Sequence, residues 1–181
     1  MTTRAVVIAA LMLVGCRSTQ HATPVAVVPE VDLARFMGDW YIIASIPTFI
    51  EKDAYNAVES YRLAADGTIE TTFTFRAGSF TGEKKRYTPR GFVLDHQSNA
   101  VWGMRFIWPV KADYRIAYLT PEYGQTVIAR ENRDYVWIMA RAPQIPDDDY
   151  QRMLQFVGAQ GYDLSKIRLV PQRWESDPEI P

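Results

Sequence analysis

The residue types that most often carry catalysis are sparse in this 181-residue chain. Its two histidines are His21, in a polar segment, and His96, directly after Asp95. An Asp-His pair can orient an imidazole as a general base, but no nucleophile is placed beside this one. The sequence also lacks a Gly-x-Ser-x-Gly elbow and a histidine pair at metal-ligand spacing. We therefore expect His96 to lie in a solvated turn, and we assign no catalytic residue, metal or cofactor.

The sequence is rich in side chains that can bind an apolar ligand, since 48% of its residues are hydrophobic and 13% are aromatic. Large apolar side chains recur at every second position of several β-rich runs, which places them on one face of each strand. In the run 113–120 this face holds Tyr114, Ile116 and Tyr118. Such a surface suits an acyl chain or similar amphiphile, although the same side chains would also form a dry core. The candidate ligand-binding residues are Trp137, Tyr114, Phe106, Met104, Trp108, Tyr135, Phe75 and Met139.

Two further groups of residues are candidates for contacts at one end of these strands. The cations Lys84, Lys85, Arg86 and Lys111 could meet an anionic headgroup, although a solvated rim is the simpler interpretation of isolated surface charges. The loop 47–51 carries apolar side chains at positions 49 and 50, which suit a mouth cover, a membrane contact or a partner interface. The sequence leaves this choice open.

The first fifteen residues have the pattern of a targeting segment. Arg4 supplies a positive charge, and residues 5–14 form an apolar run that is too short to span a bilayer. The run ends in Leu13-Val14-Gly15-Cys16, which resembles the bacterial lipobox, where the cysteine is acylated. Cys16 is the only cysteine, so it has no internal disulfide partner. We predict a lipid-anchored protein; a conventional signal peptide with an incidental cysteine is the alternative.

Length and charge restrict the class of protein further. The chain is long enough for one well-buried domain and short for two. Its net charge of −1 argues against a nucleic-acid partner, which would favour a basic surface. No run of like charges stands out, so electrostatics does not identify a partner.

The centre of the chain consists of β-rich runs separated by turn signals such as Asp66-Gly67 and Tyr123-Gly124. With no helical pattern between them, these runs predict an all-β, eight-stranded up-and-down antiparallel β-barrel, which can enclose one small ligand. An immunoglobulin-like sandwich is the alternative, but the sequence lacks the cysteine pair that such a domain places around a tryptophan. The expected strands are 39–46, 55–64, 68–76, 84–94, 100–107, 113–120, 125–130 and 134–141.

Helical patterns flank the strands on both sides. Asp32 is placed to cap a short turn of helix whose apolar residues, including Phe36, would plug one end of the barrel. After the strands, residues 150, 153, 154 and 157 are apolar, which gives one face of a helix that starts at Pro146 and stops at Gly161. We expect this α-helix to pack outside the barrel.

Gly38-Asp39-Trp40 at the start of the first strand and Arg141 at the end of the last strand form a specific combination. It resembles the signature of the lipocalin family, in which the arginine lies across the tryptophan and closes the barrel floor. The likeness is greatest to the bacterial outer-membrane lipoprotein lipocalins, on stretches that include 133–138 and 161–166. The stretch 119–123 stands where the family has its second motif, but Thr120 and Pro121 replace the usual acidic start, which puts the polar contacts of that corner in doubt.

The resemblance implies four segments and a function. The segments are a lipoprotein signal peptide (1–15), an acylated Cys16 with a flexible tether (16–30), the barrel domain (31–174) and a polar tail (175–181). The implied function is binding, storage or transport of a fatty acid or lysophospholipid by a protein anchored in the outer membrane with its barrel facing the periplasm. Gly38, Trp40 and Arg141 would close the barrel. The alternatives are an enzyme acting on a lipid or isoprenoid and an envelope interaction protein with a filled barrel; a homodimer is left open.

Overall fold

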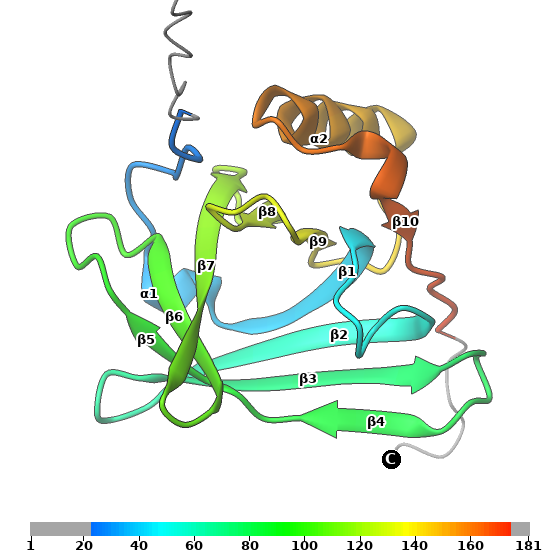
Figure 1. The fold of residues 1–181 in the computed structure, drawn as a ribbon, viewed down its shortest axis with the longest axis horizontal. Coiled ribbons are helices and arrows are strands. Elements are labelled where there is room, and N and C mark those ends of the chain that lie inside the picture. The colour runs from blue at the N-terminus through cyan, green and yellow to red at the C-terminus, as the bar shows by residue number, and fades with distance from the viewer. Residues whose placement is uncertain (1–22, 175–181) are drawn as a thin grey trace, which may run out of the picture.

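A closed antiparallel sheet makes up most of the computed structural model, which describes residues 23–174 (Figure 1). The expected signal peptide, Cys16 and the polar tail lie outside the described residues. Successive strands of the barrel pair with one another, apart from two short strands at the fourth position that both pair with the strand before them. β1 (Gly38–Ile46) also pairs with β9 (Val136–Ala140), which closes the barrel and confirms the expected fold. The other strands of the barrel are β2 (Ala54–Leu63), β3 (Ile69–Ala77), β4 (Lys84–Tyr87), β5 (Arg90–Val93), β6 (Val101–Ile107), β7 (Val110–Leu119) and β8 (Gln125–Ala129).

The fourth position of the barrel holds two short strands where the sequence predicts one continuous strand over 84–94. Pro89 separates them, because a proline has no N–H to donate to a neighbouring strand. β4 pairs with the second half of β3, where Phe73 lies opposite Tyr87, and β5 pairs with its start, where Ile69 lies opposite Gly91. The expected strand is therefore present in the sheet but is broken at its proline.

Apolar side chains form one cluster inside the barrel and a second outside it. The outer cluster is covered by α2 (Asp147–Ala159), whose Met153 and Val157 are fully buried against the sheet, as the helical pattern predicts. The short elements α1 (Leu33–Phe36), η1 (Leu164–Lys166) and β10 (Arg168–Leu169) complete the structure. Within residues 23–174, no helix combines the length and apolar composition needed to cross a bilayer.

A register shift in β7 changes the face of one predicted interior residue. Tyr114 and Ile116 point into the barrel, as the alternation predicts, but the pairing with β8 shifts between Ile116 and Tyr118. A bulge of this kind adds a residue and reverses the faces that follow it. Tyr118 accordingly lies outside, with its ring 5.4 Å from that of Phe156 on α2, so its predicted place in the interior is wrong.

Arg141 and Trp40 lie together at one end of the barrel, which we call the floor. The guanidinium carbon of Arg141 is 3.8 Å from the centre of the fully buried Trp40 ring. Gly38 has φ +96°, and a Cβ there would lie 3.3 Å from Nη1 of Arg141, so a side chain would crowd the stack. The Arg141 guanidinium also donates to the backbone carbonyls of Asp39 (2.8 Å), Met37 (2.8 Å), Arg35 (3.0 Å) and Phe36 (3.0 Å).

The stretch 119–123 retains its polar contacts at the floor despite Thr120 and Pro121. The Tyr123 hydroxyl accepts a hydrogen bond from the Asp32 N–H at 2.8 Å, and the Arg35 guanidinium lies 4.1 Å from the Tyr123 ring centre. Thr120 Oγ1 accepts from the N–H groups of Gly124 (3.0 Å) and the residue after it (3.1 Å). The hydroxyl of Thr120 thus caps the turn between β7 and β8.

Residues 23–30, which the sequence assigns to the tether, lie against the barrel. Val25 is only 3% exposed, and the Val28 N–H donates to the Ile116 carbonyl at 3.0 Å. The Thr23 carbonyl accepts a hydrogen bond from Arg133, which lies in the β8–β9 connection. The described part of the chain therefore begins beside that connection, at the end of the barrel opposite the floor.

We predict that Arg141→Ala lowers the free energy of unfolding by about 2–4 kcal/mol, because it removes the cation–π contact and leaves several carbonyls without their donor. Urea denaturation measures this change. Arg141→Lys keeps the charge but not the planar fork, so it should lose less. Ligand preference should change little, since the side chain lies at the floor; unchanged unfolding together with lost binding would contradict the structural role.

Candidate functional site

A cavity of about 80 Å³ lies in the half of the barrel away from the floor, towards the open end that we call the mouth. Because β1 runs from the floor and its neighbours are antiparallel, the β1–β2, β3–β4, β6–β7 and β8–β9 connections all lie at the mouth. The walls of the cavity are mainly apolar and aromatic. They comprise Ile42, Ile50, Phe73, Met104, Phe106, Ala112, Tyr114 and Trp137, with the polar Thr48, Glu51, Glu59, Asp113 and Arg130.

Below the cavity the barrel is filled by aromatic rings. The Trp102 and Tyr114 rings are stacked with centres 5.3 Å apart, and Phe36 from α1 meets Trp102 edge-on at 5.5 Å. Tyr61 joins this layer, and its hydroxyl is hydrogen-bonded to that of Tyr114. The interior is therefore a packed layer near the floor and a small cavity near the mouth.

The structure brings some of the predicted ligand-binding residues to the cavity and places others elsewhere. Trp137, Tyr114, Phe106 and Met104 line it. Phe75 and Met139 are buried in the interior cluster, 3% and 0% exposed, and are not part of the cavity wall. Tyr135 lies beside Trp137 with ring centres 6.4 Å apart, whereas Trp108 is 78% exposed at the β6–β7 hairpin. Ligand contact by these residues remains a prediction.

Two carboxyl groups, those of the buried Glu51 and the half-buried Glu59, are the site residues that sequence reasoning missed. Glu59 comes from β2 and Glu51 from the β1–β2 connection, and both line the cavity. Glu51 accepts hydrogen bonds from the Thr48 N–H at 2.9 Å and from the Trp137 indole at 3.2 Å. The Glu59 carboxylate accepts from the Tyr61 hydroxyl. Strand alternation offered a signal, because Glu59 shares the inward face of β2 with Ala57 and Tyr61.

The apolar surroundings change the acidity of these groups. The pKa of Glu59 is raised to about 7. Burial is the main cause and the nearby Glu51 charge adds to it, while the hydrogen bond from Tyr61 opposes the rise. Burial likewise raises the pKa of Glu51, opposed by its hydrogen bonds from Thr48 and Trp137. The pKa values of Tyr61 and Tyr114 rise well above 10 through burial and the negative charge of Glu59, so both hydroxyls stay protonated.

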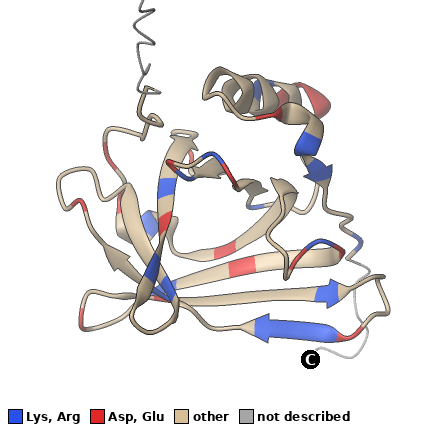
Figure 2. Cartoon of the chain, viewed as in Figure 1, with Lys and Arg blue, Asp and Glu red and all other residues tan. Residues whose placement is uncertain are grey.

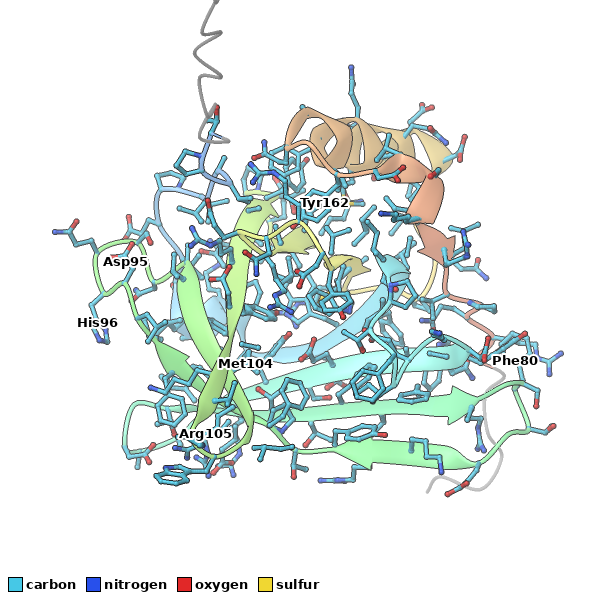
Figure 3. All side chains as sticks on the ribbon, viewed as in Figure 1. Phe80, Asp95, His96, Met104, Arg105 and Tyr162 are labelled. Carbon is cyan, nitrogen blue, oxygen red and sulfur yellow. The ribbon has the colours of Figure 1, made fainter. Side chains whose placement is uncertain are left out.

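The other charged residues of the cavity wall have partners of opposite sign. Asp113 accepts from Arg115 Nε at 3.0 Å and from the Glu131 N–H at 2.7 Å. Arg130 lies 3.4 Å from an oxygen of Asp134, and its backbone N–H and carbonyl both bond to the Tyr162 hydroxyl, at 2.7 and 2.9 Å. The stretch 161–166 is thus attached to the β8–β9 connection through Tyr162, which Figure 3 labels beneath α2.

The predicted cations do not converge on the cavity. Lys84 and Arg86 are exposed on β4, whose basic colouring is visible in Figure 2. Lys85 pairs with Glu83 at 2.7 Å, and the Lys111 ammonium lies 4.1 Å from the Phe92 ring centre. None of these side chains belongs to the cavity wall.

His96 is exposed on the β5–β6 connection at the floor end. Figure 3 shows it and Asp95 on a loop at the left edge of the molecule, away from Met104. The Asp95 carboxylate accepts from the Ser98 hydroxyl at 2.6 Å and from the Gln97 N–H at 3.0 Å, which shapes the turn rather than orienting an imidazole. The pKa of Asp95 is lowered by these hydrogen bonds, the Ser98 hydroxyl first.

Large apolar side chains are exposed around the mouth, and we call this set the mouth rim. Phe49 is 82% exposed in the β1–β2 connection. The β6–β7 hairpin adds Phe106, Ile107, Trp108 and Val110, each at least half exposed. Exposed apolar residues gathered at one end of a molecule indicate a contact with a membrane, a ligand or a partner.

Comparison with known proteins gives consistent relatives over most of the chain. A family model described as a lipocalin-like domain matches residues 31–172. Temperature-induced lipocalin-1 of Arabidopsis thaliana is 31% identical over 158 residues, which cover 81% of this chain and 82% of that protein. The outer membrane lipoprotein Blc of Escherichia coli (strain K12) is 28% identical over 164 residues, 91% and 92% of the two chains. The solved structure of insecticyanin from the tobacco hornworm Manduca sexta has a TM-score of 0.66 at 14% sequence identity. The match covers 86% of this chain and 87% of the insecticyanin chain, which shows that the two have the same fold.

We predict that Glu59 makes the stability of the protein fall as the pH rises from about 4.5 to about 7. In this window the unfolded chain ionises the carboxyl freely, while the folded protein holds it protonated, so the folded state binds more protons. Relative to Glu59→Gln, the unfolding free energy of the wild type should decrease across the window by on the order of 2–3 kcal/mol. Denaturant titrations at a series of pH values measure the difference. Glu83→Gln, at an exposed position, is the control, and parallel profiles for the wild type and Glu59→Gln would contradict the assignment.

Proposed function

The chain belongs to the lipocalin family, and from this we propose that it binds a single lipid, a fatty acid or a lysophospholipid, in the barrel cavity and stores or carries it in the cell envelope. Proteins of this family generally bind or transport ligands. The observation that carries the proposal is the cavity itself, which has apolar and aromatic walls and lies towards the mouth. The alternative of a completely filled barrel is disfavoured by the same observation.

Burial of an acyl chain against the cavity wall would provide the binding energy. Trp137, Phe106 and Met104 contribute large apolar surfaces, and each Å² removed from water is worth about 25 cal/mol. At about 80 Å³ the cavity is smaller than the ~300–1,000 Å³ of sites that enclose a whole drug-sized ligand. A long chain would therefore extend past the cavity onto the mouth rim, whose apolar side chains are exposed in its absence.

The relatives and the place where the described chain begins support a proposal for the location. The similar proteins from Citrobacter freundii and Escherichia coli are named as outer membrane lipoproteins. We propose the same anchoring here through acylated Cys16, with the barrel on the periplasmic side. Thr23 lies at the mouth end, and the seven residue steps from Cys16 to Thr23 span at most about 25 Å, so the anchor and the mouth rim would be on the same side of the molecule.

Binding is favoured over catalysis by the residue types in the cavity wall. No serine, cysteine or histidine of the described chain lines the cavity. Glu51 and Glu59 are the groups that an enzyme acting on a lipid would use as acid and base. A chemically altered lipid after incubation with the protein would support that alternative.

We predict that the chain beginning at Arg17, purified without detergent, carries lipid at a one-to-one ratio in native mass spectrometry. Organic extraction would then identify the lipid class. Trp137→Ala should lower the occupied fraction several-fold, since the ring forms part of the cavity wall.

Trp174→Ala is the matched control for this experiment. Trp174 is 48% exposed and lies against Tyr41, outside the barrel, with ring centres 5.3 Å apart. Equal loss of lipid in the two variants would place the lipid elsewhere. A protein that carries no lipid and binds neither added fatty acids nor lysophospholipids would overturn the proposal.

A further inference from the structure

The charges inside the cavity do not balance. Its wall holds three carboxyl groups, those of Glu51, Glu59 and Asp113, and one guanidinium, that of Arg130. Arg130 Nε lies 3.4 Å from an oxygen of Asp134 without a hydrogen bond to it, and Asp113 is paired with Arg115 at 3.0 Å. The two remaining carboxyl groups, Glu51 and Glu59, form no ion pair with a residue of the range 23–174.

Neutral groups take the place of a cation at both carboxyl groups. Glu51 accepts from a backbone N–H and the Trp137 indole, and Glu59 accepts from the Tyr61 hydroxyl, which is itself bonded to Tyr114. The other groups around Glu59 are the rings of the wall and the paired Asp113 and Arg130. Glu51 and Glu59 also repel each other when both are ionised. When Glu59 is ionised, the site is therefore an apolar pocket that concentrates uncompensated negative charge.

We propose that this cavity selects amphiphiles that carry a protonated amine, with Glu59 and Glu51 as the counter-ions of the ammonium group. The inference rests on the proposed function, since it uses the same cavity, and it names the head group that the cavity takes. A primary ammonium has three donors and a positive charge, which suit two carboxylates that still have acceptor capacity. The aromatic rings of Phe73, Tyr114 and Trp137 can further stabilise a cation.

A bare fatty acid carboxylate fits the same position poorly. It would add a third unpaired negative charge to a desolvated pocket, where like charges are costly. The exposed cations of β4 lie outside the cavity wall and do not offset this cost. Among lipids of the envelope, those with an amine in the head group should therefore bind more tightly than those with a carboxylate alone.

The pH dependence of binding should differ in sign between the two kinds of ligand. Glu59 has a pKa of about 7, so it is mainly ionised at about pH 8 and mainly protonated at about pH 5.5. An amine stays protonated at both values and loses a counter-ion as the pH falls. A carboxylate ligand experiences less repulsion at the lower pH, so its affinity should rise.

Titration calorimetry of the purified protein with dodecylamine, dodecanol and dodecanoic acid, below their aggregation concentrations, tests the proposal. At about pH 8 we expect the amine to bind about tenfold or more tightly than the acid, with the alcohol between them. At about pH 5.5 this ratio should shrink. Glu59→Gln should weaken amine binding about tenfold, while Glu59→Asp, which keeps the charge, should retain the preference for the amine.

Glu83→Gln removes one negative charge from the β3–β4 connection, outside the cavity, and should change amine affinity by less than about twofold. Acid and alcohol binding without amine preference would overturn the inference and leave the proposed function intact. Amine binding that is unchanged in Glu59→Gln would also overturn it. Failure of all three ligands at both pH values would overturn the proposed function as well.

Discussion

The arrangement of the barrel depends on the contact between Arg141 and Trp40. One guanidinium covers an indole from the first strand and donates to the carbonyls around α1, so it joins the start of the sheet, its end and the plug between them. The indole N–H donates in turn to the Phe36 carbonyl at 2.9 Å. Because this end is closed by packed rings and hydrogen bonds, a ligand can enter only from the opposite end.

The interior divides into two layers because the floor is closed by packed rings. Phe36, held at the floor by α1, packs on Trp102 and Tyr61, and these rings fill the lower half of the barrel. The upper half retains a cavity, and the lower boundary of this cavity includes the polar edge of the ring layer, the Tyr114 hydroxyl. Glu59 lies next to that edge, which gives an otherwise apolar cavity a polar and acidic base.

The fold and part of the site were predictable from the sequence, because strand alternation and helix periodicity determine which face is buried. Spacing placed Met104, Phe106 and Tyr114 on one face of their strands, and all three line the cavity. Trp137, which also lines it, was assigned to the inward face because it shares the face of Arg141, which the family resemblance places over Trp40. Features that break the period were not predictable in this way. The bulge after Ile116 turns Tyr118 outward. The residue types around the bulge do not indicate its position in the sequence.

Glu59 was missed for a different reason. Its position on β2 satisfies the inward alternation, but a charged residue is usually assigned to a surface. Which carboxyl groups have cationic partners depends on contacts between segments that are separated in sequence, such as that of Arg115 on β7 with Glu131 in the β8–β9 connection at 3.0 Å. Local patterns carry no information about such pairing.

A crystal structure of the protein with its co-purified lipid tests lipid binding in this cavity most directly. We expect the acyl chain to lie between Trp137 and Met104 and to leave by the mouth rim. Lipid density confined to the outer surface of the barrel, with the cavity unchanged, would contradict the proposed site.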